Sequence, residues 1–525
     1  MTDLANQYAA LANAFNARDW LKVREISAQL LPLMPDHGAV RYMAGISCLE
    51  LAQIAPALEH LRHAVLLEPL RVHYLAQLAR VLSITQQLDE ARLCADRAMQ
   101  LGPADPVSLN ALGQVYTKAQ AHPEAVEAFS RAVALMSNDA AYRFNLGNAL
   151  IAGGRFAAAT IELETCIKLD SCYWPAYLAR AQLRRWSSSE NHIGELSSLV
   201  QKHQGDHHAL AQLQMALAKE CEDVGRYHDA FANYTLGKTA GGLLRSYSSE
   251  RDEELFNAVM ASVQSAQPGK VGFATDEPIF VIGMPRTGTT LLDRIITSHP
   301  DAASAGELQN FGMTIKRMSG SKTRMMLDVD TISSTRQIDW SALGDSYLRS
   351  TRPATGKTRH FVDKLPHNFI YAGHIANALP NAKIICVRRH PLDTCLSNFR
   401  YAFSPESPYY DYSYSLLDTG RYYVLFDRLM AHWRRIFPGR IMEVRYESLV
   451  ESQEETTRSI LAHCGLTWNS SCLQFQDNPA PVATASATQV REPIYRTALH
   501  RWRRYQTELN ELESMLVGEG IEFES

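Results

Sequence analysis

The chain has 525 residues, of which 46% are hydrophobic and 21% are charged, and its formal net charge is -4. A chain of this length exceeds what one hydrophobic core holds, so we expect at least two domains. The small negative charge provides no overall basic field, which argues against nucleic acid as the partner.

Cysteine usage and the N-terminal sequence predict a cytoplasmic protein. The nine cysteines are an odd number and include no C-x-x-C pair, which argues against a disulfide framework and against a zinc site. The N-terminal stretch MTDLANQYAALANAF lacks a basic segment followed by an apolar one, and no apolar run is as long as a membrane span. We therefore expect a reduced environment, no metal and no membrane-spanning segment.

Residues 1–245 contain an internal repeat of 34 residues. Small residues recur at this spacing in three columns, and prolines recur in a fourth. The columns are Gly45, Ala79, Gly113 and Gly147; Ala57, Ala91, Ala125 and Ala159; Ala64, Ala98, Ala132 and Cys166; and Pro35, Pro69 and Pro103. Small residues are needed where the two helices of a hairpin touch, and proline marks the end of the second helix. The period resembles that of the tetratricopeptide repeat, which implies an α-solenoid of five to seven helical hairpins.

Some parts of this region fit the pattern less well. Leu11 to Pro35 reads as a degenerate first unit and ECEDVGRYHDAFANY as a last one, whereas Ser187 to Asp206 is polar and irregular. A solenoid of this family implies a concave face for a protein or peptide, and a rigid spacer or a homodimerisation arm is an equal alternative. Residues 246–277 are predicted to form a charged helix followed by a linker.

Residues 278–525 begin with a strand, a glycine-containing loop and a helix in direct succession. The apolar run Ile279–Ile282 is typical of a strand that is buried on both faces. The loop Gly283-Met-Pro-Arg-Thr-Gly288-Thr289-Thr290 follows it. Glycines allow successive backbone N–H groups to point at an anion, and the helix N-terminus adds a partial positive charge. The stretch therefore predicts a phosphate-binding loop.

The cation of this loop distinguishes it from other phosphate-binding loops. Nucleoside triphosphatases carry a lysine after the second glycine, where this chain has Thr289, and its own cation is Arg286 inside the loop. The run Arg286-Thr287-Gly288-Thr289-Thr290 resembles the 5′-phosphosulfate loop of sulfotransferases. This resemblance implies that all five residues bind the cofactor 3′-phosphoadenosine 5′-phosphosulfate (PAPS).

Further buried strands are predicted at 360–362, 383–387 and 441–444, each followed by polar residues. Strands that alternate with helices predict a doubly wound α/β domain, in which ligands gather at the carboxyl ends of the strands. The predicted fold class is therefore a tetratricopeptide-repeat α-solenoid followed by a P-loop-like parallel-sheet domain over residues 278–525.

The segment VRRHPLDTCLSNF, which begins at the end of the strand predicted at 383–387, strengthens the resemblance to sulfotransferases. The resemblance assigns Arg389 and Ser397, which are eight positions apart, to the 3′-phosphate of the cofactor. Arg388 is a neighbour that competes for this role. A guanidinium fork suits a phosphate group, which favours a binding role over a surface ion pair.

Two later segments resemble parts of the nucleotide site. Tyr446 corresponds to a family tyrosine that lies against the adenine, and a buried structural tyrosine is the alternative. Residues 485–496 resemble a loop that closes over the nucleotide, and Arg491 is the contact that we expect from it.

Sulfuryl transfer needs positioning, fixed positive charge and a general base. The resemblance places Arg286 and Lys364 at the leaving phosphate. It assigns the base to Glu307, which follows Gly306 as in the protein-tyrosine branch of the family, and His367 is the competing base. This chemistry requires no metal.

Eight aromatic residues lie between Tyr401 and Tyr423 without a helix or strand period. They predict a substrate wall or lid, with core packing as the alternative. We interpret the chain as a PAPS-dependent sulfotransferase fronted by repeats, whose acceptor is a protein tyrosine or another hydroxyl. The alternatives are a P-loop kinase or nucleoside triphosphatase, and a scaffold whose enzyme domain is inactive.

Overall fold

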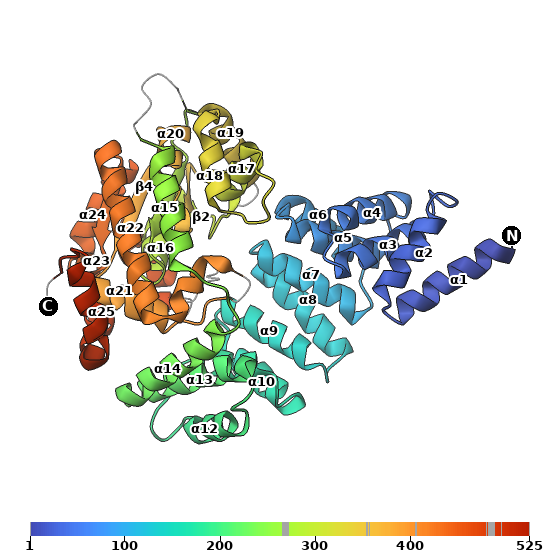
Figure 1. Cartoon of the computed structure of the whole chain (residues 1–525), viewed down its shortest axis with the longest axis horizontal. Coiled ribbons are helices and arrows are strands. Elements are labelled where there is room, and N and C mark those ends of the chain that lie inside the picture. The colour runs from blue at the N-terminus through green and yellow to red at the C-terminus, as the bar shows by residue number, and fades with distance from the viewer. Residues whose placement is uncertain are drawn as a thin grey trace. The chain divides into compact units, whose positions relative to one another are not determined.

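The computed structural model describes residues 2–264, 272–352, 355, 357–404, 407–478, 480, 489–494 and 496–523. The chain forms two compact units, Met1–Ala176 and Tyr177–Ser525 (Figure 1). Residues 265–271 of the predicted linker, and residues 481–488 and 495 in and before the predicted closing loop, lie outside the described residues.

The first unit is a series of helical hairpins, which confirms the predicted α-solenoid. Its helices are α1 (Thr2–Asn16), α2 (Trp20–Leu30), α3 (Gly38–Glu50), α4 (Ile54–Leu67), α5 (Val72–Ile84), α6 (Leu88–Gln100), α7 (Pro106–Lys118), α8 (His122–Leu135), α9 (Ala140–Ala152) and α10 (Phe156–Leu169). Consecutive helices pack in pairs, and the predicted degenerate first unit is the hairpin α1–α2.

Side-chain size is matched across each hairpin, which explains the first column of small residues. A Cβ atom placed on Gly113 would lie 2.5 Å from the ring of Phe129 in the facing helix, and Gly45 and Gly147 face leucines in the same way. The corresponding pair of the hairpin α5–α6 is Ala79 and Ala95, both fully buried. A large residue on one helix therefore goes with glycine on the other, because the interior is close-packed.

The turn inside each hairpin has the same backbone conformation, although the residue type at that position varies. One residue of each turn has a left-handed φ near +57° to +74°. These residues are Arg18, Ala52, Gln86, Gln120 and Gly154, each 34 positions after the one before. Only one of the five is glycine, so the column could not be recognised from residue type.

The second unit joins a helical hairpin to a parallel sheet. Its helices are α11 (Trp174–Gln182, which begins in the first unit), α12 (Ile193–Lys202), α13 (His207–Asp223), α14 (Tyr227–Gly242), α15 (Ser249–Ser262), α16 (Thr289–Thr297), α17 (Asn310–Ser319), α18 (Val329–Ser333), α19 (Trp340–Thr351), α20 (Ala372–Ala378), α21 (Pro391–Phe399), α22 (Leu416–Ile436), α23 (Tyr446–Glu451), α24 (Gln453–Cys464) and α25 (Gln506–Gly518). Short 3₁₀ turns include η2 (Pro366–Phe369), η3 (Pro408–Tyr414), η6 (Gln489–Arg491), η7 (Arg496–Ala498) and η8 (Arg501–Tyr505).

The sheet has five parallel strands in the order β2-β3-β1-β4-β5. They are β1 (Pro278–Gly283), β2 (Ala302–Ser304), β3 (His360–Asp363), β4 (Lys383–Arg388) and β5 (Ile441–Arg445). Four of them coincide with the predicted strands, and the three-residue β2 was not predicted because it is too short to show a pattern.

Helices cover both faces of the sheet, as the doubly wound prediction requires. Alternate residues of β1 enter different cores: Phe280 packs with residues of α15, α19 and α22, whereas Ile279 and Val281 pack with residues of α16 and α24. The buried run of β1 therefore has an apolar partner on each side, and its carboxyl end is fixed in position.

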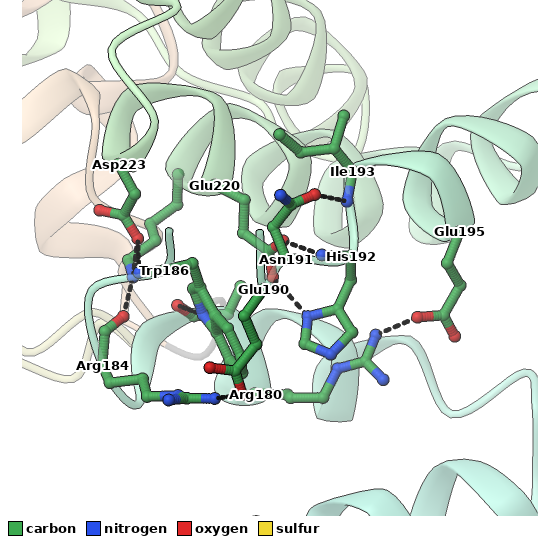
Figure 2. Close-up of polar contacts among 12 residues, drawn as sticks. Arg180, Arg184, Trp186, Glu190, Asn191, His192, Ile193, Glu195, Glu220 and Asp223 are labelled. Atoms are coloured by element: carbon green, nitrogen blue, oxygen red, sulfur yellow. Dashed lines mark hydrogen bonds and ion pairs between the residues drawn. The ribbon is translucent and has the colours of Figure 1, made fainter. Parts of the chain in front are cut away.

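The hairpin α13–α14, which the repeat pattern assigns to the solenoid, lies in the second unit. The stretch Ser187–Asp206 before it was predicted to be irregular, but it contains α12. Figure 2 shows how the preceding loop is tied to α13: the ring of His192 lies 2.9 Å from Glu220, and the backbone N–H of Trp186 donates to Asp223 at 2.9 Å. These contacts lie within the compact unit that begins at Tyr177. The domain boundary near 245 stays a prediction.

The size matching between facing helices can be tested by a double-mutant cycle in the first unit. We expect Gly113→Ala to destabilise α7–α8 by a net amount of about 1 kcal/mol, because overpacking costs about 1–3 kcal/mol and exceeds the helix propensity gained. Phe129→Ala alone should cost about 3–5 kcal/mol. The double variant reproduces the Ala79–Ala95 pair, so it should be more stable than the sum of the single effects by about 1 kcal/mol.

Amide hydrogen exchange of α7 and α8, followed by mass spectrometry, measures these local stabilities. Additive effects of the two substitutions would show that the close approach of Gly113 and Phe129 is not a constraint.

Candidate active site

Three neighbouring strands, β3, β1 and β4, end at the same edge of the sheet, and the predicted site residues follow them. Phe280 of β1 is level with Asp363, the last residue of β3, and Gly283 of β1 is level with Val387 of β4. The anion loop, Lys364 and Arg389 therefore leave the sheet side by side. The predicted gathering of motifs at the carboxyl edge is what the sheet topology produces.

The loop after β1 makes a tight turn into α16. Gly288 has a φ of +105°, and a Cβ atom there would lie 2.5 Å from the ring of Tyr446. Arg286 also has a left-handed φ, +66°, which is uncommon for a residue with a side chain. The Thr287 hydroxyl donates to the Met284 carbonyl at 2.8 Å and closes the turn. The backbone is thus set by contacts on both sides of the loop.

Arg389 and Tyr446 lie against the same loop. The guanidinium carbon of Arg389 is 4.8 Å from the centre of the Tyr446 ring, and the ring packs on Gly288. Arg389 also pairs with Asp393 at 3.3 Å and donates to the Ala498 carbonyl. Ser397 is half-buried on α21. The ring of Tyr446 is therefore buried, and it packs against the anion loop.

The structure separates Arg388 from Arg389, which the sequence left as competitors. Arg388 pairs with Asp427 and, at 3.2 Å, with Glu443, and it lies 5.3 Å from the Phe426 ring. The two arginines therefore have different partners, since successive residues at a strand end point to opposite sides. Arg389 is the one beside the anion loop.

Lys364, predicted at the leaving phosphate, and Glu307, the predicted base, are in direct contact. Lys364 Nζ donates to Glu307 Oε1 at 2.5 Å, and the Lys364 backbone N–H donates to the Gly306 carbonyl at 2.9 Å. The Lys364 side chain is 2% exposed and the Glu307 side chain is 40% exposed. A buried ammonium group thus contacts a carboxylate that is accessible to solvent.

Two buried carboxyl groups support this pair. Asp293 of α16 accepts a hydrogen bond from Ser304 at 3.0 Å, and Ser304 accepts one from the Gly306 backbone at 3.2 Å. Burial raises the pKa of Asp293 to about 6, although the charge of Lys364 opposes the shift. These bonds fix the turn that carries Glu307.

Asp363, which precedes Lys364, is the second support. It is fully buried and accepts a hydrogen bond from the Tyr347 hydroxyl at 2.7 Å. Burial raises its pKa to about 7, while the Tyr347 hydroxyl and the backbone N–H groups of Leu308 and Leu365 act in the opposite direction. Asp363 therefore lies between the residues that follow Glu307 and Lys364.

His367, the competing base, lies in an apolar setting. Its ring centre is 4.9 Å from that of Tyr410 and 5.7 Å from that of Tyr409. Burial lowers its pKa to about 3, so the ring is neutral near pH 7. A base with so low a pKa is poorly matched to neutral pH, which favours Glu307.

Rings of the aromatic segment contact one another and Arg286 of the anion loop. The Arg286 guanidinium lies 4.9 Å from the Tyr401 ring, Tyr401 meets Phe403 edge to face, and Phe403 stacks on Tyr410 at 4.2 Å. Burial and then the charge of Glu307 raise the pKa of Tyr410, which places that ring near the carboxylate. The rings run from the anion loop to His367.

Two further arginines, Arg400 and Arg501, act on Arg286. Burial lowers the pKa of Arg286, and the positive charges of Arg400, Arg389 and Arg501 lower it further against the opposing effect of Tyr401. Arg400 follows the helix that carries Ser397, and Arg501 lies in η8. Arg501 begins the basic run Arg501, Arg503 and Arg504 that follows the predicted closing loop, whereas Arg400 lies in no motif of recognisable spacing.

Buried donors in this cluster fit an anionic ligand. Among the described residues, the Nε–H groups of Arg389 and Arg400 are buried and have no hydrogen-bond acceptor. An unpaired buried donor on a charged group is costly, and a phosphate oxygen would satisfy it. The residues present therefore fit an anionic group such as a phosphate.

Arg491, the predicted contact from the closing loop, has a described neighbour on α16. It lies in η6 beside Arg294 of α16, whose pKa it helps to lower after burial. Arg294 donates to the Ala480 carbonyl at 2.8 Å and to the Asn478 carbonyl at 2.5 Å. Arg491 is not among the charges that act on Arg286, and its contact with a nucleotide stays a prediction.

No cluster of three or more His, Cys, Asp or Glu side chains in the described ranges is arranged to hold a metal ion. No helix in the part of the chain that the structure describes is both long and apolar enough to cross a membrane.

The C-terminal part of the chain is similar to known proteins. Residues 278–470 match the sulfotransferase family. An uncharacterised protein of Aquifex aeolicus (strain VF5) is 34% identical over 251 residues, which are 47% of this chain and 33% of that protein. A protein-tyrosine sulfotransferase of Drosophila melanogaster is 24% identical over 233 residues, 43% of this chain and 46% of that protein. The chain thus spans less than half the length of these two relatives.

A solved structure, the sulfotransferase domain of the olefin synthase of Synechococcus PCC 7002, also matches. It is 20% identical with a TM-score of 0.35, and the match covers 49% of this chain and all of that domain.

The role of Asp363 can be tested through the pH dependence of stability. Its pKa is raised from 3.8 to about 7 in the folded state, so the folded state binds the proton more tightly than the unfolded state. The stability that this provides is complete below about pH 4 and is lost as the pH rises through 7. Asp363→Asn keeps an acceptor for Tyr347 but removes the titration.

We therefore expect the free energy of unfolding of Asp363→Asn, relative to wild type, to rise by up to about 4 kcal/mol between pH 4 and pH 7. Hydrogen exchange of β1 and β3 at several pH values measures the difference. A difference that does not vary with pH would contradict the assignment of a protonated, buried Asp363.

Proposed function

Because residues 278–470 match the sulfotransferase family, we propose that the chain transfers a sulfuryl group from PAPS to an acceptor hydroxyl. The observation that carries the proposal is the contact of Lys364 with Glu307 at the sheet edge where Arg286 and the anion loop lie. A proton acceptor, a buried cation and an anion site are thereby within one cluster, which is what group transfer to a hydroxyl requires.

The chain offers a donor set for each charged part of PAPS. Arg286 and the backbone of Thr287–Thr290 would hold the 5′ side, and Arg389 with Ser397 the 3′-phosphate. The Tyr446 ring, packed on Gly288 and Arg389, would lie against the base. The unpaired Nε–H of Arg389 supports this assignment. When bound, PAPS supplies an activated sulfuryl group whose leaving group is a phosphate.

Glu307 would act as the general base. Its partly exposed carboxylate accepts the proton of the acceptor hydroxyl, and a hydroxyl that loses its proton becomes the attacking oxygen. Lys364 supplies fixed positive charge and a proton donor at the same edge. Because Lys364 is buried against Glu307, its charge is poorly screened and acts strongly on groups nearby.

The acceptor that we propose is a phenol, such as a protein tyrosine. The wall formed by Tyr401, Phe403 and Tyr410 offers ring faces and edges beside Glu307, and such contacts select a flat aromatic acceptor. The likeness to a Drosophila protein-tyrosine sulfotransferase supports the same class. A peptide on the repeats, a homodimer and a cytoplasmic location belong to the same proposal.

The cofactor assignment predicts a specific nucleotide preference. We expect the full chain to bind adenosine 3′,5′-bisphosphate more tightly than ATP with magnesium in isothermal titration calorimetry. Arg389→Ala should weaken the bisphosphate by about 10- to 100-fold, the effect of losing charge-assisted hydrogen bonds. Arg388→Ala is the matched control: it breaks the contacts with Asp427 and Glu443 and should lower stability with little effect on affinity. Preference for ATP would overturn the proposal.

The assignment of the base predicts a second difference. With PAPS and a tyrosine-containing peptide, Glu307→Gln should lower kcat by about 10²- to 10⁴-fold. His367→Phe keeps an aromatic ring among Tyr409, Tyr410 and Phe369 and should change kcat by less than about tenfold. A larger loss in His367→Phe than in Glu307→Gln would exchange the two roles.

A further inference from the structure

The hairpin α13–α14 has the sequence of a repeat but contacts the candidate active site. Glu222, near the end of α13, pairs with Arg400 and lies 3.7 Å from Arg501. The Tyr234 hydroxyl of α14 donates to the same carboxylate at 3.0 Å. Two of the four arginines beside the anion loop therefore have a carboxylate partner on α13, and Glu222 lies 178 residues before Arg400.

Glu222 is ionised in this setting although it is buried. Its side chain is 8% exposed. Burial raises its pKa, but the charges of Arg400 and Arg501 together with the Tyr234 hydroxyl outweigh burial, and the net shift is downward. The buried Glu222 carboxylate is therefore the counter-ion of Arg400 and Arg501.

Glu222 balances part of the positive charge of the arginine cluster. Arg286, Arg389, Arg400 and Arg501 carry four positive charges, and ion pairs join Arg389 to Asp393 and both Arg400 and Arg501 to Glu222. Without Glu222, Arg400 and Arg501 would repel their two neighbours in a poorly screened site. The arginines would then turn toward solvent, since a guanidinium without a partner is costly to bury.

The other acids of α13 face a different part of the molecule. Figure 2 shows Glu220 at His192 and Asp223 at Trp186, and Asp223 also pairs with Lys219 at 2.5 Å. Residues two apart on a helix are about 200° apart around its axis, so Glu220 and Glu222 point in nearly opposite directions. Helix α13 thus holds the preceding loop with one side and the arginines with the other.

The same hairpin also holds the aromatic segment. Lys238 of α14 is buried and donates to the Tyr401 carbonyl at 2.7 Å and to the Ser413 hydroxyl at 3.2 Å. A Cβ atom on Gly241 would lie 2.5 Å from the Tyr414 ring, which shows how closely α14 approaches this segment. Tyr401, Ser413 and Tyr414 of this segment are therefore in contact with α14.

From these contacts we propose that Glu222 is a positioning residue for the nucleotide, supplied by the repeat-like hairpin. It holds Arg400 and Arg501 beside Arg286, so that their N–H groups are oriented before the bisphosphate part of the cofactor arrives. The buried, unpaired Nε–H of Arg400 is a donor that this orientation leaves available. This inference rests on the proposed function, because it assigns a second layer of residues to the same nucleotide site.

Calorimetric titration of the full chain with adenosine 3′,5′-bisphosphate tests the inference. We expect Glu222→Gln to weaken binding by about 10- to 100-fold, because the neutral amide no longer holds two guanidinium groups. Glu222→Asp keeps the charge and should recover part of the affinity. Glu220→Gln is the matched control on the same helix and should lower the melting temperature without changing the affinity.

The outcomes separate this inference from the proposed function. If wild type binds the bisphosphate and Glu222→Gln binds it equally or more tightly, Glu222 is only structural and the inference fails. Equal losses in Glu220→Gln and Glu222→Gln would also overturn it, since they would reflect loosening of α13 as a whole. Failure of wild type to bind would remove both conclusions.

Should Glu222→Gln not fold, Tyr234→Phe decides the question. This variant removes only the hydroxyl that donates to Glu222. It should weaken the bisphosphate severalfold, and unchanged affinity would overturn the inference.

Discussion

The position of β1 between β3 and β4 is the constraint on which the candidate site depends. Its register places Gly283 level with Val387 and Phe280 level with Asp363, so the anion loop, Arg389 and Lys364 leave the sheet at one edge. Apolar cores on both faces hold β1 in that register. A slip of one residue would exchange these faces, so the hydrophobic pattern that stabilises the sheet also fixes the geometry of the charged groups.

Burying charge is the cost of that geometry, and the surrounding residues offset it. Lys364 is enclosed and meets Glu307, Arg389 meets Asp393, and Arg400 meets Glu222. Each pair keeps a cation in a poorly screened place where its field is strong. The pairs add little net stability, because desolvation consumes most of the Coulomb energy. Their arrangement is better explained by what a dianionic ligand requires than by folding.

The sequence predicted the elements of the site better than their supports. The glycine loop, Lys364, Arg389 and Tyr446 could be found because each lies at a fixed distance from a strand with a clear apolar pattern. Glu222 and Arg400 are 178 residues apart, and no spacing rule connects them. The left-handed turn residues escaped notice for another reason: four of the five are not glycine. Local patterns reveal local geometry, whereas pairings across the fold need the fold itself.

The hairpin α13–α14 shows why a repeat and a compact unit are different divisions of a chain. The 34-residue period records how two helices pack on each other, and Ala230 is fully buried in that role. It does not determine what the outer sides of the hairpin contact. Here those sides carry Glu222 and Lys238, which hold Arg400 and the aromatic segment. A hairpin of this kind can keep its internal packing while its charged side chains contact a neighbouring site. In this chain the hairpin lies in the same compact unit as the sheet.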